Sequence, residues 1–168
     1  WVYNPKITPK SDHIISTSID SILTDFSSNI EIINSEINSS VLLTSSKKSR
    51  LIYSGGEVSL DILRNPPQKN NFNKGEQIIS VLLEGRFTSQ YKNTTISNTI
   101  NFVSENNDGK MIVVSDGDII GNKVNPTKFY YPLGFYRYNN SVFKGNTDFI
   151  LNSVQYLCND EDLIKIRN

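Results

Sequence analysis

Two apolar runs most strongly limit what this chain can fold into. Residues 78–85 and residues 111–115 are both rich in Val, Ile and Leu, and turn-forming or charged residues follow each of them. Short apolar runs bounded in this way favour β-strands. Because residues 111–115 show no polar–apolar alternation, they are expected to form a strand covered on both faces, as in a parallel sheet. We therefore expect a buried sheet at the centre of the fold.

Three further segments have the character of shorter strands. Residues 41–46 form a small apolar run that ends in Thr and Ser, and residues 26–33 carry three isoleucines. Residues 163–167 alternate apolar and basic side chains and are expected to be either a last strand or an exit from the domain. The polar stretch at residues 66–75, which begins with two prolines, is expected to be an exposed loop.

One helix is predicted near the C-terminus, at residues 146–157, with Asn146 or Thr147 as its cap. Its apolar side chains at helical spacing, which are expected to face the core, are Phe149, Ile150, Val154 and Leu157. Strands, connections and then a helix are the order of an α/β domain. The length of 168 residues fits one domain, which we place at residues 1–168.

Charge and composition exclude some classes of protein. The 17 basic and 17 acidic side chains balance, which argues against a protein that binds nucleic acid. A run of about 18 apolar residues, as needed to cross a bilayer, is absent from the sequence. The chain begins at Trp1 rather than Met, so we interpret it as a piece of a longer protein whose membrane segments lie elsewhere.

Asp116, Gly117 and Asp118 directly follow the second apolar run. Carboxylates just beyond a buried strand lie where α/β proteins commonly bind ligands, and two of them could hold Mg²⁺ through oxygen. Phosphotransferases of the haloacid-dehalogenase type have such a pair, but they follow it with Thr or Val, where this chain has Ile119 and Ile120. The favoured interpretation is a turn, since Asp and Gly are common turn residues.

Other residue types that carry chemistry occur singly. Arg86 follows the first apolar run and could hold an anion, although a salt bridge at the strand end is the favoured interpretation. Cys158 is expected to be a buried structural thiol near a helix C-terminus, where the helix dipole opposes a thiolate. His13 lies in a turn rich in Ser and Asp and cannot form a multi-histidine zinc site. The aromatic residues between 122 and 143 are expected to form a long loop that packs locally or contacts a partner.

Six stretches, in order along the chain, carry a resemblance to a known family. They are residues 41–46, 81–89, 111–120, 132–135, 145–152 and 160–167. Together they resemble the gliding-motility-associated ABC transporter accessory protein G family of the Bacteroidetes. The resemblance implies a Rossmann-like, glutamine-amidotransferase-like α/β fold with a mostly parallel sheet. That sheet would be incomplete here because the chain lacks the upstream part of the domain.

The resemblance also implies a role. It indicates a non-catalytic accessory component of an ABC-type transporter involved in gliding motility, with permease and ATPase subunits as partners and homo-oligomerisation as a further option. The domain would lie on the periplasmic face of the inner membrane and would need no cofactor. Two alternatives stay open: a module that binds a sugar or anion through Asp116, Asp118 and Arg86, and a Mg²⁺-dependent phosphohydrolase.

Overall fold

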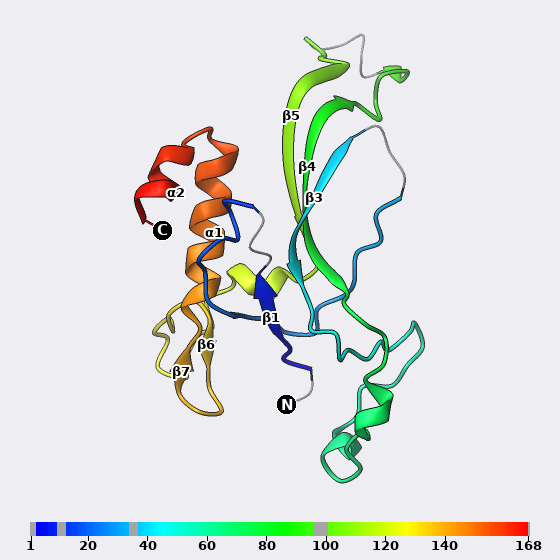
Figure 1. Cartoon of the computed structure of the whole chain (residues 1–168), viewed down its shortest axis with the longest axis vertical. Helices are drawn as coiled ribbons and strands as arrows, with labels where there is room; N and C mark the ends of the chain where they lie inside the picture. The colour runs from blue at the N-terminus through cyan, green and yellow to red at the C-terminus, as the bar shows by residue number, and fades with distance from the viewer. Residues whose placement is uncertain (1–2, 10–12, 34–36, 96–100, 168) are drawn as a thin grey trace.

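The computed structural model describes residues 3–9, 13–33, 37–95 and 101–167. Its main feature is a five-stranded sheet in which the strands are ordered β2-β1-β3-β4-β5 (Figure 1). The strands are β1 (Lys6–Pro9), β2 (Ile22–Leu23), β3 (Asn38–Thr44), β4 (Ile78–Thr88) and β5 (Glu105–Val114). Every neighbouring pair in this sheet is antiparallel.

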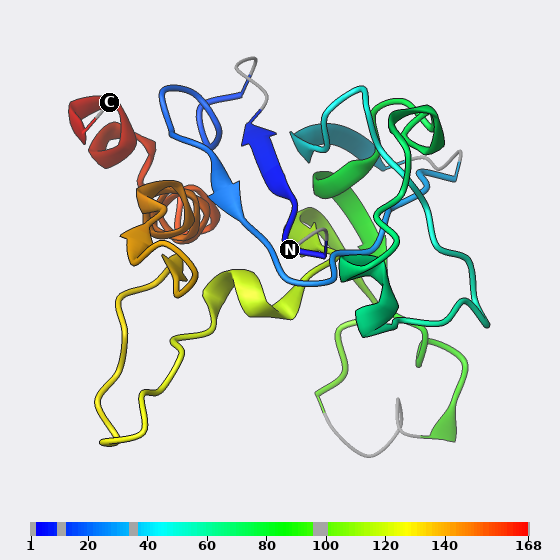
Figure 2. The same ribbon diagram turned by 90° about the horizontal axis from the view of Figure 1, so that it is seen from below.

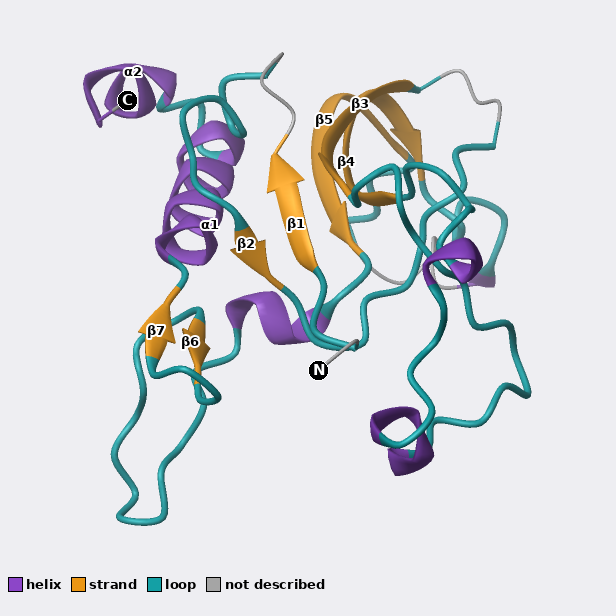
Figure 3. Cartoon of the chain, turned by 60° about the horizontal axis from the view of Figure 1, so that its bottom comes forward, coloured by secondary structure: helices purple, strands orange, loops and turns teal. Residues whose placement is uncertain are grey.

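The predicted mostly parallel, Rossmann-like and glutamine-amidotransferase-like sheet is therefore wrong. Neighbouring parallel strands need a crossover of about a dozen or more residues, usually a helix, between them. In the part of the chain that the structure describes, both α-helices come after the last strand of the sheet. The order of elements thus favours hairpins and meanders rather than βαβ units, and the sheet curls into a half-barrel (Figure 3).

The prediction for residues 111–115 is wrong in a related way. They lie mostly within β5, which is an edge strand with β4 as its partner, and Met111 is 47% exposed. The strand is therefore not covered on both faces. By contrast, the strands predicted at residues 41–46 and 78–85 are confirmed as β3 and β4. Residues 26–33 contribute one bridge, from Ile30 to Ile78.

The long β4–β5 ladder bends at a register shift between Gly85 and Phe87. Gly85 has φ +135°, in the region that favours glycine. On the opposite strand, a Cβ on Gly109 would lie 2.3 Å from the Phe87 ring, so this ring packs directly over the glycine backbone. The two glycines together let the ladder bend while an aromatic side chain covers it.

The remaining elements follow the sheet or connect its strands. They are the 3₁₀ turns η1 (Leu60–Leu63), η2 (Lys69–Asn71) and η4 (Gly117–Ile120), the short pair β6 (Phe135–Tyr136) and β7 (Ser141–Val142), and the helices α1 (Lys144–Leu157) and α2 (Glu161–Arg167). The segment predicted as a last strand or an exit, residues 163–167, is helical. Among the described residues, no helix is long and apolar enough to cross a membrane.

The core lies between the sheet and the helices, and β1, β2, β3 and β4 all contribute to it. Its buried residues are Ile7, Ile15, Ile22, Leu42, Leu43, Ile79, Leu82, Ile119, Phe149, Tyr156 and Ile164. The helix face predicted from apolar spacing is partly wrong: Phe149 is buried, but Val154 and Leu157 are 54% and 39% exposed. Asn146 and Asn152 are buried in their place. The helix therefore meets the sheet through a face that is part apolar and part amide.

Candidate functional site

The turn after β5 is organised by the side chain of Asp116, which is buried. Its Oδ1 accepts a hydrogen bond of 2.8 Å from the backbone N–H of Asp118, and its Oδ2 accepts one of 2.7 Å from the N–H of Asp25. Asp116 thereby caps η4 and also joins the end of β5 to the segment after β2. The turn predicted at these residues is confirmed, with both carboxylate oxygens engaged by backbone donors.

Taken together, the surroundings of Asp116 make its charged form less favourable than it is in water. Burial raises the pKa of this carboxyl above its ordinary value, and the negative charges of Asp118 and Asp25 raise it further. The two backbone N–H donors act in the opposite direction and stabilise the carboxylate. The raised pKa therefore has a structural cause, the removal of the side chain from water.

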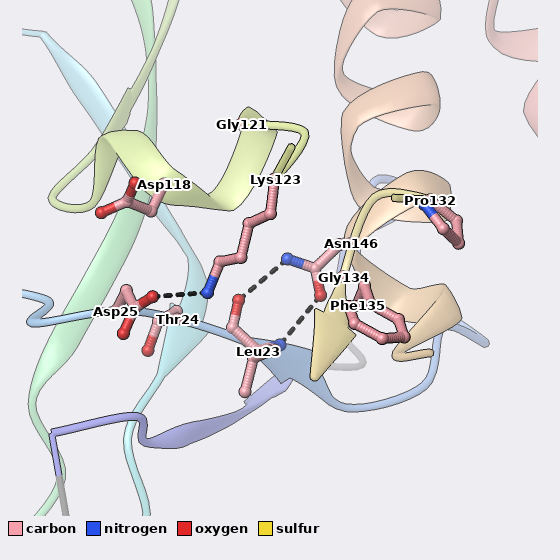
Figure 4. A pocket seen from close by; sticks show the side chains of 10 residues that line it. All are labelled: Leu23, Thr24, Asp25, Asp118, Gly121, Lys123, Pro132, Gly134, Phe135 and Asn146. Carbon is pink, nitrogen blue, oxygen red and sulfur yellow. Dashed lines mark hydrogen bonds and ion pairs between the residues drawn. The ribbon is translucent and has the colours of Figure 1, made fainter. Parts of the chain in front are cut away.

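A small pocket lies next to this turn, between the end of β2, η4, β6 and the first turn of α1 (Figure 4). Its lining residues are Leu23, Thr24, Asp25, Asp118, Gly121, Lys123, Pro132, Gly134, Phe135 and Asn146. Its volume is about 20 Å³, enough for a water molecule or a small ion. This volume is too small for a sugar, because ligand pockets usually measure hundreds of cubic ångströms.

Two polar contacts shape the pocket. The Lys123 ammonium extends from beyond η4 to Asp25 and forms an ion pair of 2.7 Å (Figure 4). Asn146 accepts a hydrogen bond from the Leu23 N–H at 2.9 Å and donates to the Leu23 carbonyl at 2.8 Å. The walls of the pocket are therefore tied to one another across large sequence separations, and the cation is already paired.

The structure brings Asp116 and Asp118 together but places Arg86 elsewhere. In the β4–β5 register, Ser80 pairs with Val114 and Gly85 with Gly109, so Arg86 lies at the far end of the ladder from the turn. Six residues of strand correspond to roughly 20 Å. The salt bridge predicted for Arg86 is confirmed, and Glu105 is its partner. Ligand binding by Asp116, Asp118 and Arg86 stays a prediction.

His13 and Cys158 lie at the other end of α1. The His13 imidazole packs edge-on against the Tyr156 ring, with 5.0 Å between ring centroids. Cys158 is the C-cap of α1, as its predicted place at the helix end requires, but it is exposed, so the expectation of a buried thiol is wrong. In the described part of the chain, no three His, Cys, Asp or Glu side chains are grouped so that they could hold a metal ion.

A polar cluster surrounds Tyr156. Its hydroxyl donates a hydrogen bond of 2.8 Å to Glu84 on β4, and the Lys110 ammonium from β5 lies 4.3 Å from its ring centroid. Burial, followed by the hydrogen bond to Glu84, raises the pKa of Tyr156 to about 12. The cluster joins α1 to the sheet and delays ionisation of this phenol to higher pH than in an ordinary tyrosine.

Sequence reasoning identified Asp118 but missed the other polar residues that shape the pocket. Asp25 and Lys123 are 98 positions apart, and Leu23 and Asn146 are 123 apart. No local motif links residues at such separations, and Asn146 was expected only as a helix cap. Its position inside the first turn of α1, facing the sheet, is the feature that gives it a different role.

A known family matches most of the chain. Residues 1–153 match the family model described as an ABC-type uncharacterized transport system, of the auxiliary type. No curated protein and no solved structure matches the chain significantly. The match covers the sheet, the turn after β5, the pocket and most of α1.

Proposed function

The chain belongs to the ABC-type uncharacterized transport system family of auxiliary components, and from this premise we propose that it is a non-catalytic module that binds the transporter's own subunits. The observation that carries the proposal is the family match over residues 1–153. The turn after β5 supports the non-catalytic part of the proposal, because both carboxylate oxygens of Asp116 accept hydrogen bonds from backbone N–H groups of the fold. The proposed partners are the permease and the ATPase.

A crosslinking experiment in the native membrane tests this proposal. The full-length protein is crosslinked in intact cells and purified under denaturing conditions, and the attached proteins are identified by mass spectrometry. We expect peptides from an ABC permease and its ATPase at a higher level than with an equally abundant protein of the same compartment as bait. Equal recovery with both baits would contradict the proposal.

The finer proposal is a role in gliding motility on the periplasmic face of the inner membrane. It rests on the ordered resemblance of six stretches to the gliding-associated accessory protein family. Deletion of the gene is expected to stop colony spreading, and the intact gene is expected to restore it. Normal spreading after deletion would contradict the motility role but not the role in transport.

The exposed thiol of Cys158 offers a direct test of location. A membrane-impermeant maleimide should label this residue in spheroplasts without lysis if the domain faces the periplasm. The matched control is Cys158→Ser, which shows how much label other sites take up. Labelling that needs lysis would place the domain on the cytoplasmic side and contradict the proposal.

A small-ligand role is the second candidate, and the pocket beside Asp118 and Lys123 is the observation in its favour. Its small volume favours an ion over a sugar. A thermal-shift screen of inorganic ions and small carboxylates tests it, with Lys123→Gln as the variant that should lose any response. A response that is the same in both proteins would place the ligand elsewhere.

A further inference from the structure

The segment between η4 and β6 forms a small hairpin. Val124 and Tyr130 form an antiparallel bridge, and the Asn125 N–H donates to the Phe129 carbonyl at 2.9 Å. The Tyr131 N–H donates to the Lys123 carbonyl at 2.8 Å. The structure shows this segment, drawn in yellow, projecting away from the sheet and the helices (Figure 2).

The turn of this hairpin is held by the side chain of Asn125. Its Oδ1 accepts hydrogen bonds from the Thr127 N–H at 3.0 Å and from the Phe129 N–H at 2.9 Å. It also accepts one from the Thr127 hydroxyl at 2.7 Å. These contacts fix the backbone on both sides of the turn, so the side chains next to it are presented in a defined arrangement.

The hairpin presents large apolar side chains to solvent. Phe129 is 72% exposed, Tyr130 is 77% exposed and Val124 is 56% exposed. Aromatic side chains on a projecting and internally bonded turn are not part of the core. Their exposure carries a hydration cost that is removed only when another apolar phase covers them.

The charged residues of the hairpin and of the segment after it are all basic, while Asp25 and Asp118 lie near the base of the hairpin beside Lys123. Between residues 119 and 147 the chain carries Lys123, Lys128, Arg137 and Lys144 and no acidic side chain, although the whole chain has a net charge of zero. Lys123 is neutralised by Asp25, whereas Lys128 is exposed within the turn itself, beside Phe129. The apolar tip therefore carries the positive charge of Lys128, which complements an anionic surface.

We propose that this hairpin tip, residues 124–130, inserts into the interface of an anionic lipid bilayer. Aromatic rings together with Lys are the side chains that favour the boundary between headgroups and acyl chains. A stable protein interface needs about 800 Å² from each partner, which calls for a broad surface rather than one narrow turn. A bilayer requires only that the tip be immersed. The proposal goes beyond the auxiliary role in transport and does not depend on transporter partners.

Vesicle binding tests the proposal. The chain of residues 1–168 is mixed with vesicles of equal parts phosphatidylglycerol and phosphatidylcholine, or of phosphatidylcholine alone, and the bound fraction is measured by sedimentation. Binding is expected to the anionic vesicles and to fall as salt is raised from low to physiological concentration. Absence of binding to the anionic vesicles at low salt would overturn the proposal.

Variants separate the hairpin from the rest of the surface. Phe129→Ser with Tyr130→Ser should lower the partition coefficient by roughly tenfold, because two rings no longer leave water. The matched control is Tyr53→Ser with Leu60→Ser, which removes side chains that are 67% and 72% exposed in the connection between β3 and β4. Equal losses in the two double variants would overturn the proposal. Circular dichroism of both variants should match that of the unmodified chain if they are folded.

A fluorescent probe reports insertion itself. The sequence has one tryptophan, Trp1, so Trp1→Phe combined with Phe129→Trp places the only indole at the tip. Its emission should shift to the blue on addition of anionic vesicles and be quenched by brominated acyl chains. The same probe at Tyr53 should not respond.

The oligomeric state distinguishes a bilayer from a second copy of the chain. If the chain dimerises as its concentration rises, and the Phe129 and Tyr130 double variant does not, the tip binds a second copy and the proposal is overturned.

Discussion

The side-chain amide of Asn146 hydrogen-bonds both backbone polar groups of Leu23, the N–H at 2.9 Å and the carbonyl at 2.8 Å. β2 is the outermost strand on its side of the sheet, with β1 as its strand neighbour. On the side of β2 that faces away from β1, the Asn146 amide supplies the hydrogen-bond donor and acceptor that a further strand would supply. One side chain of α1 thereby satisfies the sheet edge and fixes the helix against it.

Replacement of Asn146 by Leu should be strongly destabilising. The variant leaves the N–H and carbonyl of Leu23 unpaired, together with the Ile119 carbonyl that the amide also contacts at 3.2 Å. Buried groups left without partners should lower the free energy of unfolding by about 2–4 kcal/mol. Urea denaturation measures this loss. Asn65→Leu, at an exposed site, should change it by less than about 0.5 kcal/mol.

Some elements could be predicted because their signals are local. The apolar runs that became β3 and β4 and the helical spacing that became α1 are visible over a few residues. The role of Asn146 could not be predicted in the same way. An Asn near a helix start is usually a cap, and its real contact, Leu23, lies 123 positions away.

The direction of the sheet shows a second limit. An apolar run such as residues 111–115 fits both the middle of a parallel sheet and the edge of a curled antiparallel one. The run alone therefore does not determine the direction of the neighbouring strands. The last helix had a usable signal that was missed. Glu161 and Asp162 begin α2, and Lys165 and Arg167 end it, which is the charge order that a helix dipole favours.

Gly145 is expected to tolerate no larger side chain. A Cβ at this position would lie 2.3 Å from the Asp20 carbonyl oxygen and 2.6 Å from that of Ser21, both backbone atoms. Gly145→Ala should therefore displace α1 and destabilise the protein by about 1–3 kcal/mol, even though Ala favours helices. Thermal denaturation gives the comparison. Gly117→Ala, where nothing lies within 4 Å of the added Cβ, should be close to neutral.

Tyr156 should titrate later than an ordinary tyrosine. Burial and its hydrogen bond to Glu84 raise the pKa of Tyr156 to about 12. Since the unfolded pKa is about 10, the stabilisation is complete below pH 10 and is lost as the pH rises through 12. The ultraviolet absorbance of the phenolate, followed during an alkaline titration, measures this ionisation. Tyr156→Phe should remove the late component, and a late component that persists would assign it to another tyrosine.

His13 should show the opposite trend on the acid side. Burial lowers the pKa of His13 below 6.5, and Lys110 lowers it further, while Glu84 and Glu161 act against the shift. The neutral imidazole is favoured in the fold, so its contribution is complete above pH 6.5 and declines as the pH falls through the lowered value. Because His13 is the only histidine, one NMR titration gives its pKa directly. A value above 6.5 would show that the two glutamates dominate.

The last prediction distinguishes capping from ligand binding at the turn after β5. In Asp116→Asn an amide NH₂ group replaces one of the two carboxylate oxygens. Because this group only donates, either the Asp25 N–H or the Asp118 N–H loses its acceptor. The free energy of unfolding should fall by about 1–2 kcal/mol. Asp118→Asn, at an exposed side chain, should leave stability nearly unchanged.

If the turn is purely structural, calorimetry should detect no Mg²⁺ binding to the unmodified chain or to either variant. Binding that only the unmodified chain shows would instead assign the two carboxylates to a cation.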